Sequence, residues 1–600
     1  MKKFLMGNEA IALGAIRAGV KFVAGYPGTP STEILETIAK HNKGDIYVEW
    51  SINEKAAMEV GAGAAYSGAR TLVTMKQVGL NVASDPLMSL AYVGVKGGMV
   101  IISADDPGPI SSQTEQDTRR FAGFSKLPVF DPSTPEEAYL MIEDAFNYSE
   151  KYLTPVLFRP TTRVCHGSAT IELLDKVEVG EPEGFIKDTK RWVIFPRSSY
   201  LNHIKIEKRN PVIGSEFSSY RFNGVVGSGN IGIASGGVSY QYTQEALNSQ
   251  LGLADSEYSL LKISTPYPYP DELALQFLRS VKSVIVIEEL DTVIEDGLIA
   301  LCGIHNLDVK ILGKKSGHVQ LAGENSVESV TTVLATYFNI DKKATALAET
   351  PALPIRPPVL CAGCPHRASF YAVKRAMKGK KANFCGDIGC YTLGNAQPLD
   401  MTDTCLCMGA GINIAQGLER TNKDSINFAF VGDSTFFAAG LTGVVNAVYN
   451  QSNMVLIILD NATTAMTGHQ PHPGTGVTMM GEVVNKIAIA PILTAMGVVS
   501  VQTVDPLDLQ TSIEAVKLAA ETKGVTAIIF KSPCIAVTKP SAKYCIDNDV
   551  CINCKRCIKE LGCPAIVIED GKVKIEQSLC FGCSLCTQVC PKDAILRKEV

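Results

Sequence analysis

The sequence predicts an α/β protein of several domains, built mainly from doubly wound parallel sheets and ending in a small cysteine-rich tail. Apolar segments of strand length alternate with helical segments, as in TLVTM (71–75), SDPLMSLAYVG (84–94) and GMVIISA (98–104). This alternation is typical of a parallel sheet that is covered on both faces. A chain of 600 residues is also too long for one hydrophobic core and predicts about four domains.

Composition excludes several classes of protein. The chain is 46% hydrophobic and 20% charged, which is ordinary for a globular protein. A net charge of −5 without a long Lys/Arg run argues against a nucleic-acid partner. The longest apolar runs, such as MVLIIL (454–459), are too short to cross a membrane. We interpret the first residues as a helix of a cytoplasmic protein, because Asn8 and Glu9 interrupt the apolar region that an export signal needs.

Composition shifts predict where the domains begin and end. The first α/β domain is expected at 1–190, followed by a polar loop or linker up to 225. A second α/β domain, 226–345, contains the helical segment QYTQEALNSQLG and the strand SVIVIEE (283–289). The Pro-rich segment ETPALPIRPP (349–358) marks the next boundary. A third α/β domain then covers 356–540, and the cysteine-dense tail covers 541–600.

The tail carries a repeated cysteine pattern. It reads Cys551-x2-Cys554-x2-Cys557-x5-Cys563-Pro564 and then Cys580-x2-Cys583-x2-Cys586-x3-Cys590-Pro591, and between the repeats IEDGKVKI predicts a hairpin that turns at Asp570-Gly571. Residues 1–350 hold only Cys165 and Cys302 of the 18 cysteines, so we expect metal or redox sites and not disulfides. Structural zinc is the alternative, but two Cys-Pro endings favour iron–sulfur clusters.

This pattern resembles that of a bacterial two-cluster ferredoxin. The resemblance implies one 4Fe-4S cluster on Cys551, Cys554, Cys557 and Cys590, and a second on Cys563, Cys580, Cys583 and Cys586. The x5 spacing before Cys563 replaces the usual x3 and leaves the fourth ligand, or the number of irons in that cluster, open.

A strand–turn–helix–strand segment spans 427–461, NFAFVGDSTFFAAGLTGVVNAVYNQSNMVLIILDN. Asp433 follows its first strand and Asn461 its second, so both are expected at the carboxyl edge of a parallel sheet. An oxygen from each could bind one Mg²⁺, and the helix that begins between them offers free N–H groups to a diphosphate. Taken alone, Gly-Asp and Asp-Asn pairs are also common in turns.

The segment resembles the thiamine diphosphate motif, with Ser434 where a third glycine is usual. The resemblance implies that Asp433, Asn461 and the carbonyl of Thr463 hold Mg²⁺. It also implies that Gly432, Asp433 and Ser434 contact the cofactor together with Asn461, Thr463, Thr467 and Gly468.

A thiamine enzyme also needs a glutamate that bonds the aminopyrimidine ring. We assign it to Glu54, at the start of the small-residue helix in WSINEKAAMEVGAGAAYSGAR (50–70). The alternatives are Glu59, or a solvated first-turn glutamate that the helix dipole stabilises. The preceding turn YPGTPST (26–32) contains Thr29 and could equally be a helix entry capped by Ser31 or Thr32.

Thiamine modules joined to a ferredoxin tail make the chain similar to the 2-oxoacid:ferredoxin oxidoreductases along nearly its whole length. The resemblance implies two thiamine-diphosphate-binding doubly wound parallel-sheet domains, a transketolase C-terminal-like α/β domain and a two-cluster ferredoxin-like α+β tail. It further implies that Thr29 faces the substrate carboxylate and that coenzyme A takes up the acyl group. External ferredoxin would accept the electrons. The family's gamma-type domain has no counterpart here, which implies a smaller beta subunit and an (αβ)₂ heterotetramer.

The substrate and a third cluster are further inferences from the resemblance. Cys361, Cys364, Cys390 and Cys534 resemble the family's proximal 4Fe-4S ligands, whereas Cys385, Cys405 and Cys407 are expected to be buried free thiols. Met466 stands where pyruvate-using relatives have Asn, which favours an aryl 2-oxoacid such as indolepyruvate, unless it reflects local packing alone.

Three matters stay open at this point. His366 and Arg367 of CAGCPHR could contact substrate or diphosphate, or simply lie at the surface. The adjacent Cys165 and His166 are interpreted as an incidental pair and not as metal ligands. Pyruvate or a branched-chain acid is an alternative substrate. A non-oxidative thiamine decarboxylase is the alternative enzyme, although it would not need the eight cysteines of the tail.

Overall fold

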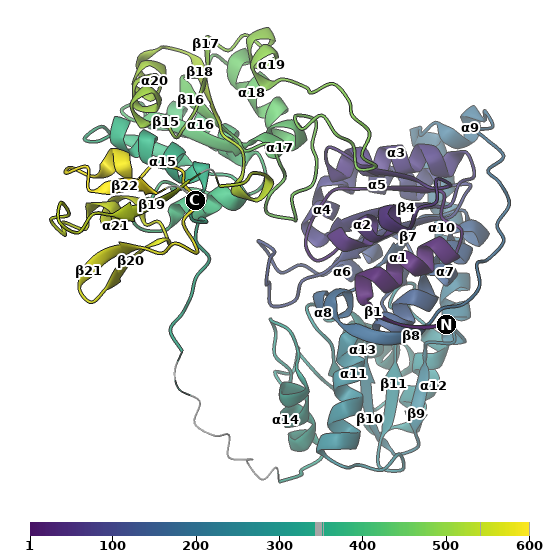
Figure 1. Ribbon diagram of the computed structural model, residues 1–600. Helices are drawn as coiled ribbons and strands as arrows, with labels where there is room; N and C mark the ends of the chain where they lie inside the picture. Colours follow the sequence, from purple (N-terminus) through teal and green to yellow (C-terminus); the bar gives the residue numbers. More distant parts are fainter. Residues whose placement is uncertain (342–350, 352, 541, 599–600) are drawn as a thin grey trace. The chain divides into compact units, whose positions relative to one another are not determined.

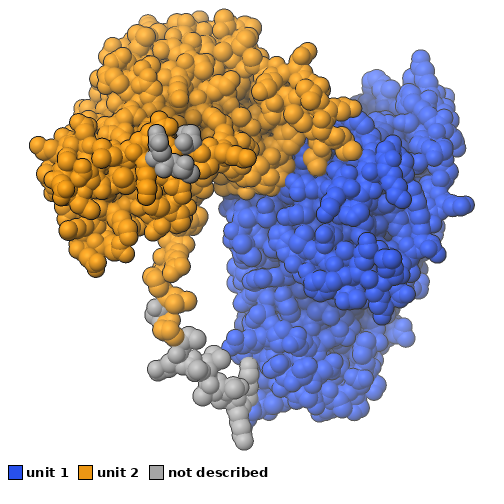
Figure 2. Space-filling model, in the orientation of Figure 1, with its two compact units in different colours: residues 1–349 blue, residues 350–600 orange. Residues whose placement is uncertain are grey.

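The computed structural model describes residues 1–341, 351, 353–540 and 542–598. It divides into two compact units, 1–349 and 350–600 (Figure 2). The predicted end of the second domain (342–345), part of the Pro-rich boundary (349, 350 and 352), the first residue of the tail (541) and its last two (599–600) lie outside the described residues. The domain boundaries remain predictions.

The first unit contains a six-stranded parallel sheet (Figure 1). In spatial order its strands are β3 (Tyr47–Trp50), β2 (Phe22–Gly25), β4 (Thr71–Lys76), β5 (Met99–Ala104), β7 (Val156–Phe158) and β6 (Val129–Phe130). Alternate side chains of β4 are buried on opposite faces of the sheet. Val73 and Met75 pack against α3 (Glu54–Tyr66) and α5 (Ser84–Val93), whereas Leu72 is buried on the other face.

Further helices and a short antiparallel pair surround this sheet. Helix α1 (Gly7–Arg17) packs against α2 (Thr32–His41) and α7 (Pro135–Tyr152). Residues 1–192 also contain the helices α4 (Gln77–Val82), α6 (Thr118–Ser125), α8 (Thr162–His166) and α9 (Thr189–Trp192), and the paired strands β1 (Lys2–Met6) and β8 (Ser168–Glu172).

The predicted loop or linker at 190–225 is wrong for most of its length. Helix α10 spans Pro196–Ser218, and its buried residues Ile206, Ile213 and Phe217 face the rest of the unit. The three apolar residues lie at helical spacing, but the surrounding polar residues and the internal Pro211 hide that period in the sequence.

A second, five-stranded sheet completes the first unit. Its strands are β13 (Lys310–Leu312), β12 (Ser283–Ile287), β10 (Ile231–Ser235), β11 (Ser259–Lys262) and the antiparallel edge strand β9 (Gly224–Gly227). One face packs against α11 (Val238–Glu245) and α14 (Val327–Tyr337), and the other against α12 (Asp271–Ser280) and α13 (Val293–His305).

The second unit is built on a five-stranded parallel sheet. In order, its strands are β14 (Ala382–Cys385), β15 (Ile426–Gly432), β16 (Met454–Asp460), β18 (Val525–Lys531) and β17 (Ser500–Val504). One face packs against α15 (Pro365–Ala376) and α20 (Leu509–Glu521), and the other against α16 (Ala410–Thr421), α18 (Leu441–Tyr449) and α19 (Ile489–Ala495).

The cysteine-rich tail packs into the core of this second unit. It contains helix α21 (Arg556–Leu561) and two antiparallel pairs, β19 (Lys543–Ile546) with β22 (Ile595–Lys598) and β20 (Ile566–Glu569) with β21 (Lys572–Ile575). The second pair confirms the predicted hairpin, whose turn residues Asp570 and Gly571 both have positive φ. Leu561, Leu585 and Val589 are buried with α15 and α20. The α/β fold with an α+β tail is therefore confirmed.

No helix among the described residues combines the length and the apolar character that a membrane span requires.

Arg119 joins the two sheets of the first unit. Arg119 is the second residue of α6 and is 2% exposed, and its guanidinium pairs with Asp117 at 2.6 Å and with Glu288 at 3.0 Å. It also donates to the carbonyl of Glu289 at 2.7 Å. Since Glu288 follows β12 of the second sheet, one buried cation holds the loops of both sheets together.

Arg119→Met should therefore destabilise the first unit by about 3 to 5 kcal/mol, because it leaves buried carboxylates without their partner. Thermal unfolding followed by calorimetry measures the effect. Arg120→Met is the matched control: its ion pairs with Asp291 and Asp296 are solvent-accessible, so their removal should cost about 1 kcal/mol or less. Equal losses from both substitutions would contradict the role of Arg119.

Candidate functional site

Asp433 and Asn461 lie together at the carboxyl edge of the second unit's sheet. Asp433 begins the short helical turn α17 (Asp433–Thr435) directly after β15, and Asn461 directly follows β16. The two strands are adjacent and parallel. Asp433 Oδ2 accepts a hydrogen bond from the backbone N–H of Ala462 at 2.8 Å. The fold thus places both predicted Mg²⁺ ligands at one point of the edge.

Negative charge is concentrated at this point. Burial, and then the nearby charge of Asp433, raise the pKa of Asp460. Both carboxylates use the same amide, since Ala462 N–H also donates to Asp460 Oδ1 at 3.3 Å. His472 Nε2 lies 3.2 Å from Asp433 Oδ2, and this nitrogen is buried without a well-aligned hydrogen bond to the described residues. A divalent cation bound here would relieve the repulsion between the carboxylates of Asp433 and Asp460.

His366 orients the amide of Asn461. Burial lowers the pKa of His366 to about 4 against the opposing charge of Asp433, so its ring is neutral near pH 7. Its Nε2 lies 3.2 Å from Asn461 Nδ2 and can accept from that NH₂ group. The Asn461 Oδ1 atom then points elsewhere and accepts from Thr463 N–H at 3.3 Å. His366 is buried, so a surface role for it is excluded.

Gly432 is required by a close aromatic neighbour. A Cβ at this position would lie 2.5 Å from the ring of Tyr391. The Tyr391 hydroxyl donates to Asp387 Oδ2 at 2.8 Å and lies 3.1 Å from Thr435 Oγ1. Burial raises the pKa of Asp387 to about 6 even though the Gly409 amide bonds it. Asp387 follows β14 as Asp433 follows β15, and so it belongs to the same edge.

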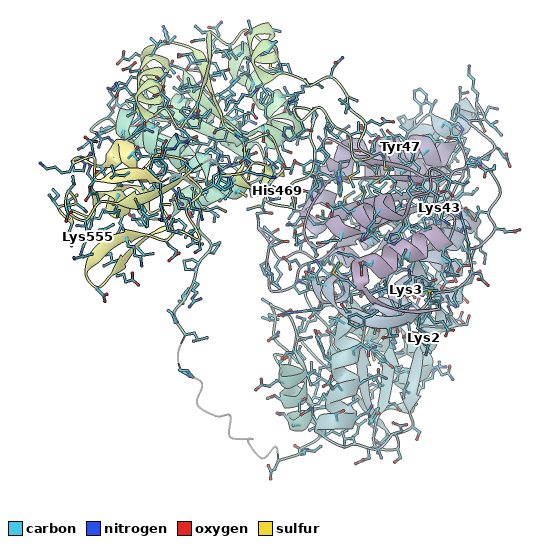
Figure 3. The ribbon with its side chains drawn as sticks, in the orientation of Figure 1. Lys2, Lys3, Lys43, Tyr47, His469 and Lys555 are labelled. Atoms are coloured by element: carbon cyan, nitrogen blue, oxygen red, sulfur yellow. The ribbon has the colours of Figure 1, made fainter. Side chains whose placement is uncertain are left out.

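The loop after Asn461 folds back on itself at the site. Thr464 N–H donates to the carbonyl of Gln470 at 3.0 Å, and Thr467 Oγ1 donates to Gln470 Oε1 at 2.6 Å. His469, labelled in Figure 3, lies in this loop with a φ of 70°. Thr464 Oγ1 reaches Ser434 Oγ at 2.9 Å, which brings the loop to α17.

The four cysteines of the predicted third cluster lie near enough to one another to interact electrostatically. Cys534 N–H donates to the carbonyl of Asn461 at 2.9 Å, and Cys364 N–H to that of Cys361 at 3.2 Å. Burial, with smaller contributions from neighbouring cysteines of this set, raises the pKa of Cys364 to about 12 and that of Cys390 to about 11. Such thiols need a strong positive charge to become thiolate ligands.

The other cysteines of this region differ from expectation. Cys385 is buried as predicted, but Cys405 and Cys407 are exposed, so their assignment as buried thiols is wrong. Within the described ranges, no group of three or more His, Cys, Asp or Glu side chains is arranged to hold a single metal ion. The Mg²⁺ prediction accordingly depends on one carboxylate with an amide and a carbonyl oxygen.

Two cavities in the tail separate its eight cysteines into the two predicted sets. Cys551, Cys554, Cys557 and Cys590 line the first. Cys563, Cys580, Cys583 and Cys586 line the second. Lys555, labelled in Figure 3, turns the first loop with a φ of 57°. The ligand sets remain a prediction, which this grouping supports.

The unusual x5 spacing forms a helical turn. Helix α21 (Arg556–Leu561) contains Cys557 as its second residue and ends two residues before Cys563, and Leu561 at its end is 1% exposed. Gly562 then reverses the chain with a φ of 59°, and a Cβ there would lie 2.4 Å from Pro398. The extra residues are thus absorbed by packing against the sheet domain, and Cys563 still lines its cavity.

In the first unit, burial distinguishes Glu54 from Glu59. Asn53 caps helix α3, and Glu54, its first residue, is 8% exposed. Burial raises the pKa of Glu54 to about 7, although its backbone hydrogen bond and Lys76 oppose the shift. A Cβ at Gly79 would lie 2.6 Å from Glu54 Oε1. Glu59 is exposed and pairs with Lys55, so the environment favours Glu54 as the functional glutamate.

Thr29 lines a cavity in the same unit with Asp106, Ser111, Arg163 and His166. Ser111 Oγ donates to the carbonyl of Thr29 at 3.2 Å. The cavity contains hydroxyl groups and one certain cation, Arg163, which pairs with Glu324, and it also contains the carboxylate of Asp106. Met466 is 52% exposed, so its surroundings within the described part of the second unit do not form an apolar pocket.

Asp387, Tyr391 and His472 also lie at the site but are not among the residues predicted from the sequence. Asp387 carried a usable signal, because GDIGC (386–390) repeats the Gly-Asp pair of Gly432 and Asp433 after a strand. Tyr391 and His472 reach the edge through loops, and their spacing gives no comparable indication.

Three family models match parts of the chain. Residues 13–216 match the family model "Pyruvate flavodoxin/ferredoxin oxidoreductase, thiamine diP-bdg". Residues 387–530 match "Thiamine pyrophosphate enzyme, C-terminal TPP binding domain", and residues 573–596 match "4Fe-4S binding domain".

Three relatives are similar along almost their whole length. Each is named "Indolepyruvate oxidoreductase subunit IorA". The protein from Methanothermobacter thermautotrophicus is 40% identical over 99% of this chain and 97% of its own. That from Archaeoglobus fulgidus has the same identity and coverage. That from Thermococcus kodakarensis is 39% identical over 98% of this chain and 96% of its own. The chain therefore belongs to the family of IorA subunits of indolepyruvate oxidoreductase, within the thiamine-diphosphate-dependent 2-oxoacid:ferredoxin oxidoreductases.

Proposed function

We propose that the chain is the large subunit of an enzyme that oxidatively decarboxylates aryl 2-oxoacids such as indolepyruvate. Coenzyme A would take up the acyl group, so that the products are an aryl-acetyl-CoA, CO₂ and reduced ferredoxin. The observation that carries this proposal is that the chain is 39–40% identical, over nearly its full length, to subunits named "Indolepyruvate oxidoreductase subunit IorA". The buried glutamate, the sheet-edge aspartate and the cysteine-lined cavities are the parts that such a reaction needs.

The residues divide the chemistry between them. Asp433, Asn461 and the Thr463 carbonyl would hold Mg²⁺ and with it the diphosphate, and His366 would fix the orientation of the Asn461 amide by accepting from its NH₂ group. When bound, thiamine diphosphate supplies a carbon nucleophile and an electron sink for decarboxylation. Glu54, with a pKa of about 7, can hold or release a proton at the aminopyrimidine ring near neutral pH. Thr29 would bind the substrate carboxylate.

The remaining parts concern the electrons and the partners. The tail cysteines would hold two 4Fe-4S clusters, and Cys361, Cys364, Cys390 and Cys534 a third, through which external ferredoxin is reduced. A smaller beta subunit would supply the gamma-type domain in an (αβ)₂ heterotetramer.

Turnover of the anaerobically purified complex tests the proposed substrate. Ferredoxin reduction is followed with coenzyme A and, in parallel, indolepyruvate, phenylpyruvate or pyruvate. We expect kcat/KM to be highest for the aryl acids. A preference for pyruvate would retain the enzyme class and overturn the substrate, and CO₂ release without ferredoxin reduction would indicate the non-oxidative decarboxylase.

Asp433→Asn should weaken Mg²⁺-dependent binding of thiamine diphosphate by more than about 10-fold, because an amide cannot replace the carboxylate at the ion. The protein should stay folded, since the substitution also removes repulsion with Asp460. Calorimetric titration measures the affinity. Asp424→Asn, at an exposed position, serves as the control, and normal affinity of Asp433→Asn would exclude the metal site.

Glu54→Gln should remove turnover and also change how stability depends on pH. Burial raises the pKa of Glu54 from 4.5 to about 7 in the folded chain. Between these values the folded state binds more protons than the unfolded state, so the free energy of unfolding falls as pH rises and levels off above about 7. Glutamine avoids the cost of burying the charge. The variant should therefore be more stable than wild type at pH 8, by roughly 3 kcal/mol, and similar at pH 4.5.

Unfolding of cofactor-free protein at both pH values provides the measurement. Glu59→Gln is the matched control, because Glu59 lies on the same helix with an exposed side chain. It should keep turnover and show no such pH-dependent gain. An active Glu54→Gln variant with wild-type pH dependence would transfer the proposed role to Glu59.

A further inference from the structure

One buried guanidinium connects two cysteine-bearing segments of the second unit. Arg367, near the start of α15, is 5% exposed. Its Nη2 donates to the carbonyls of Leu360 at 2.6 Å and Cys361 at 3.4 Å. Its Nη1 donates to the carbonyls of Leu561 at 2.6 Å and Gly562 at 2.9 Å. The first pair lies at Cys361, and the second immediately precedes Cys563.

The charge of Arg367 is not neutralised by an acid. All four hydrogen-bond acceptors within the described chain are backbone carbonyls. Two of them end helix α21, where carbonyls carry partial negative charge and favour a cation. The Nε atom is buried and has no partner in the described residues. A buried N–H without an acceptor is costly, and cluster sulfur or cysteine thiolate would provide one.

Arg367 borders two sets of cysteines, the set of the CAGC segment (361–364) and the set that includes Cys563. Arg367 lines the cavity of Cys563, Cys580, Cys583 and Cys586, together with Gly363 and Cys364. Gly363 lets its loop approach closely: its φ is 84°, and a Cβ there would lie 2.5 Å from Phe581. Arg367 also donates to the carbonyl of Cys361, so its guanidinium lies beside cysteines of both sets.

We propose that Arg367 is a positioning residue that fastens the CAGC loop (361–364) to the turn before Cys563, and that its charge raises the reduction potential of the cluster held in the adjoining cavity. The inference rests on the proposed clusters but assigns a new role to a residue that is not a ligand. It also explains how the x5 spacing is accommodated, because the guanidinium bonds the carbonyls of Leu561 and Gly562 at the end of helix α21.

The direction of the effect follows from charge. Reduction adds one electron to a cluster that four thiolates already make negative, and in the enzyme that electron comes from the oxidised 2-oxoacid. A fixed positive charge in a buried, low-dielectric site stabilises the more negative form. Its loss should therefore shift the potential to more negative values.

Arg367→Met and Arg367→Lys, produced in the full chain with its partner subunit, separate the charge from the hydrogen bonds. Iron content and a redox titration followed by electron paramagnetic resonance are the measurements. We expect Arg367→Met to shift the potential of one cluster to more negative values, or to lose that cluster's iron if the loop detaches. Arg367→Lys keeps the charge and should retain iron with a smaller shift.

Arg375→Gln is the matched control, since Arg375 lies on the same helix with an exposed side chain paired to Glu560. It should leave every potential unchanged. Full iron content with unchanged potentials in both Arg367 variants would overturn the inference. Wild-type protein that binds no iron after anaerobic reconstitution would instead overturn the proposed clusters, so the two failures are distinguishable.

Discussion

The parallel alignment of β14, β15, β16 and β18 is the constraint on which the second unit's chemistry depends. Each strand ends at the same edge, so the residues that follow them meet although they are far apart in the sequence. Asp387, Asp433, Asn461 and Cys534 are the residues that these four strands deliver. The hydrogen bond from Cys534 N–H to the Asn461 carbonyl ties the proposed metal site directly to the proposed third cluster. One sheet edge would thereby serve both proposed cofactors.

The tail is an integral part of the second unit. Leu561, Leu585 and Val589 share a core with α15 and α20, and Arg367 bonds carbonyls on both sides of the junction. Such packing keeps cysteine-lined cavities at constant positions with respect to the sheet edge, as electron transfer requires. Removal of the tail would uncover apolar surface, so single substitutions are more informative than truncation.

Much of the fold could be predicted from the sequence because buried strands and small-residue helices repeat with clear periods. The Gly432-Asp433 and Asp460-Asn461 pairs indicated a site because turns after parallel strands share an edge. The helix Pro196–Ser218 could not be predicted, since three buried apolar residues are dispersed among polar ones and Pro211. Burial of His366 and Arg367 was also beyond prediction, because it depends on tertiary contacts with Asn461 and with the end of α21.

The central claim is that oxidation of the 2-oxoacid at the thiamine site is coupled within this protein to its iron–sulfur clusters. Electron paramagnetic resonance of the anaerobic complex, frozen at intervals after indolepyruvate is added without external ferredoxin, tests it most directly. We expect signals of reduced clusters in the wild-type complex after indolepyruvate is added, and no such signals without it. CO₂ release with clusters that remain oxidised would contradict it.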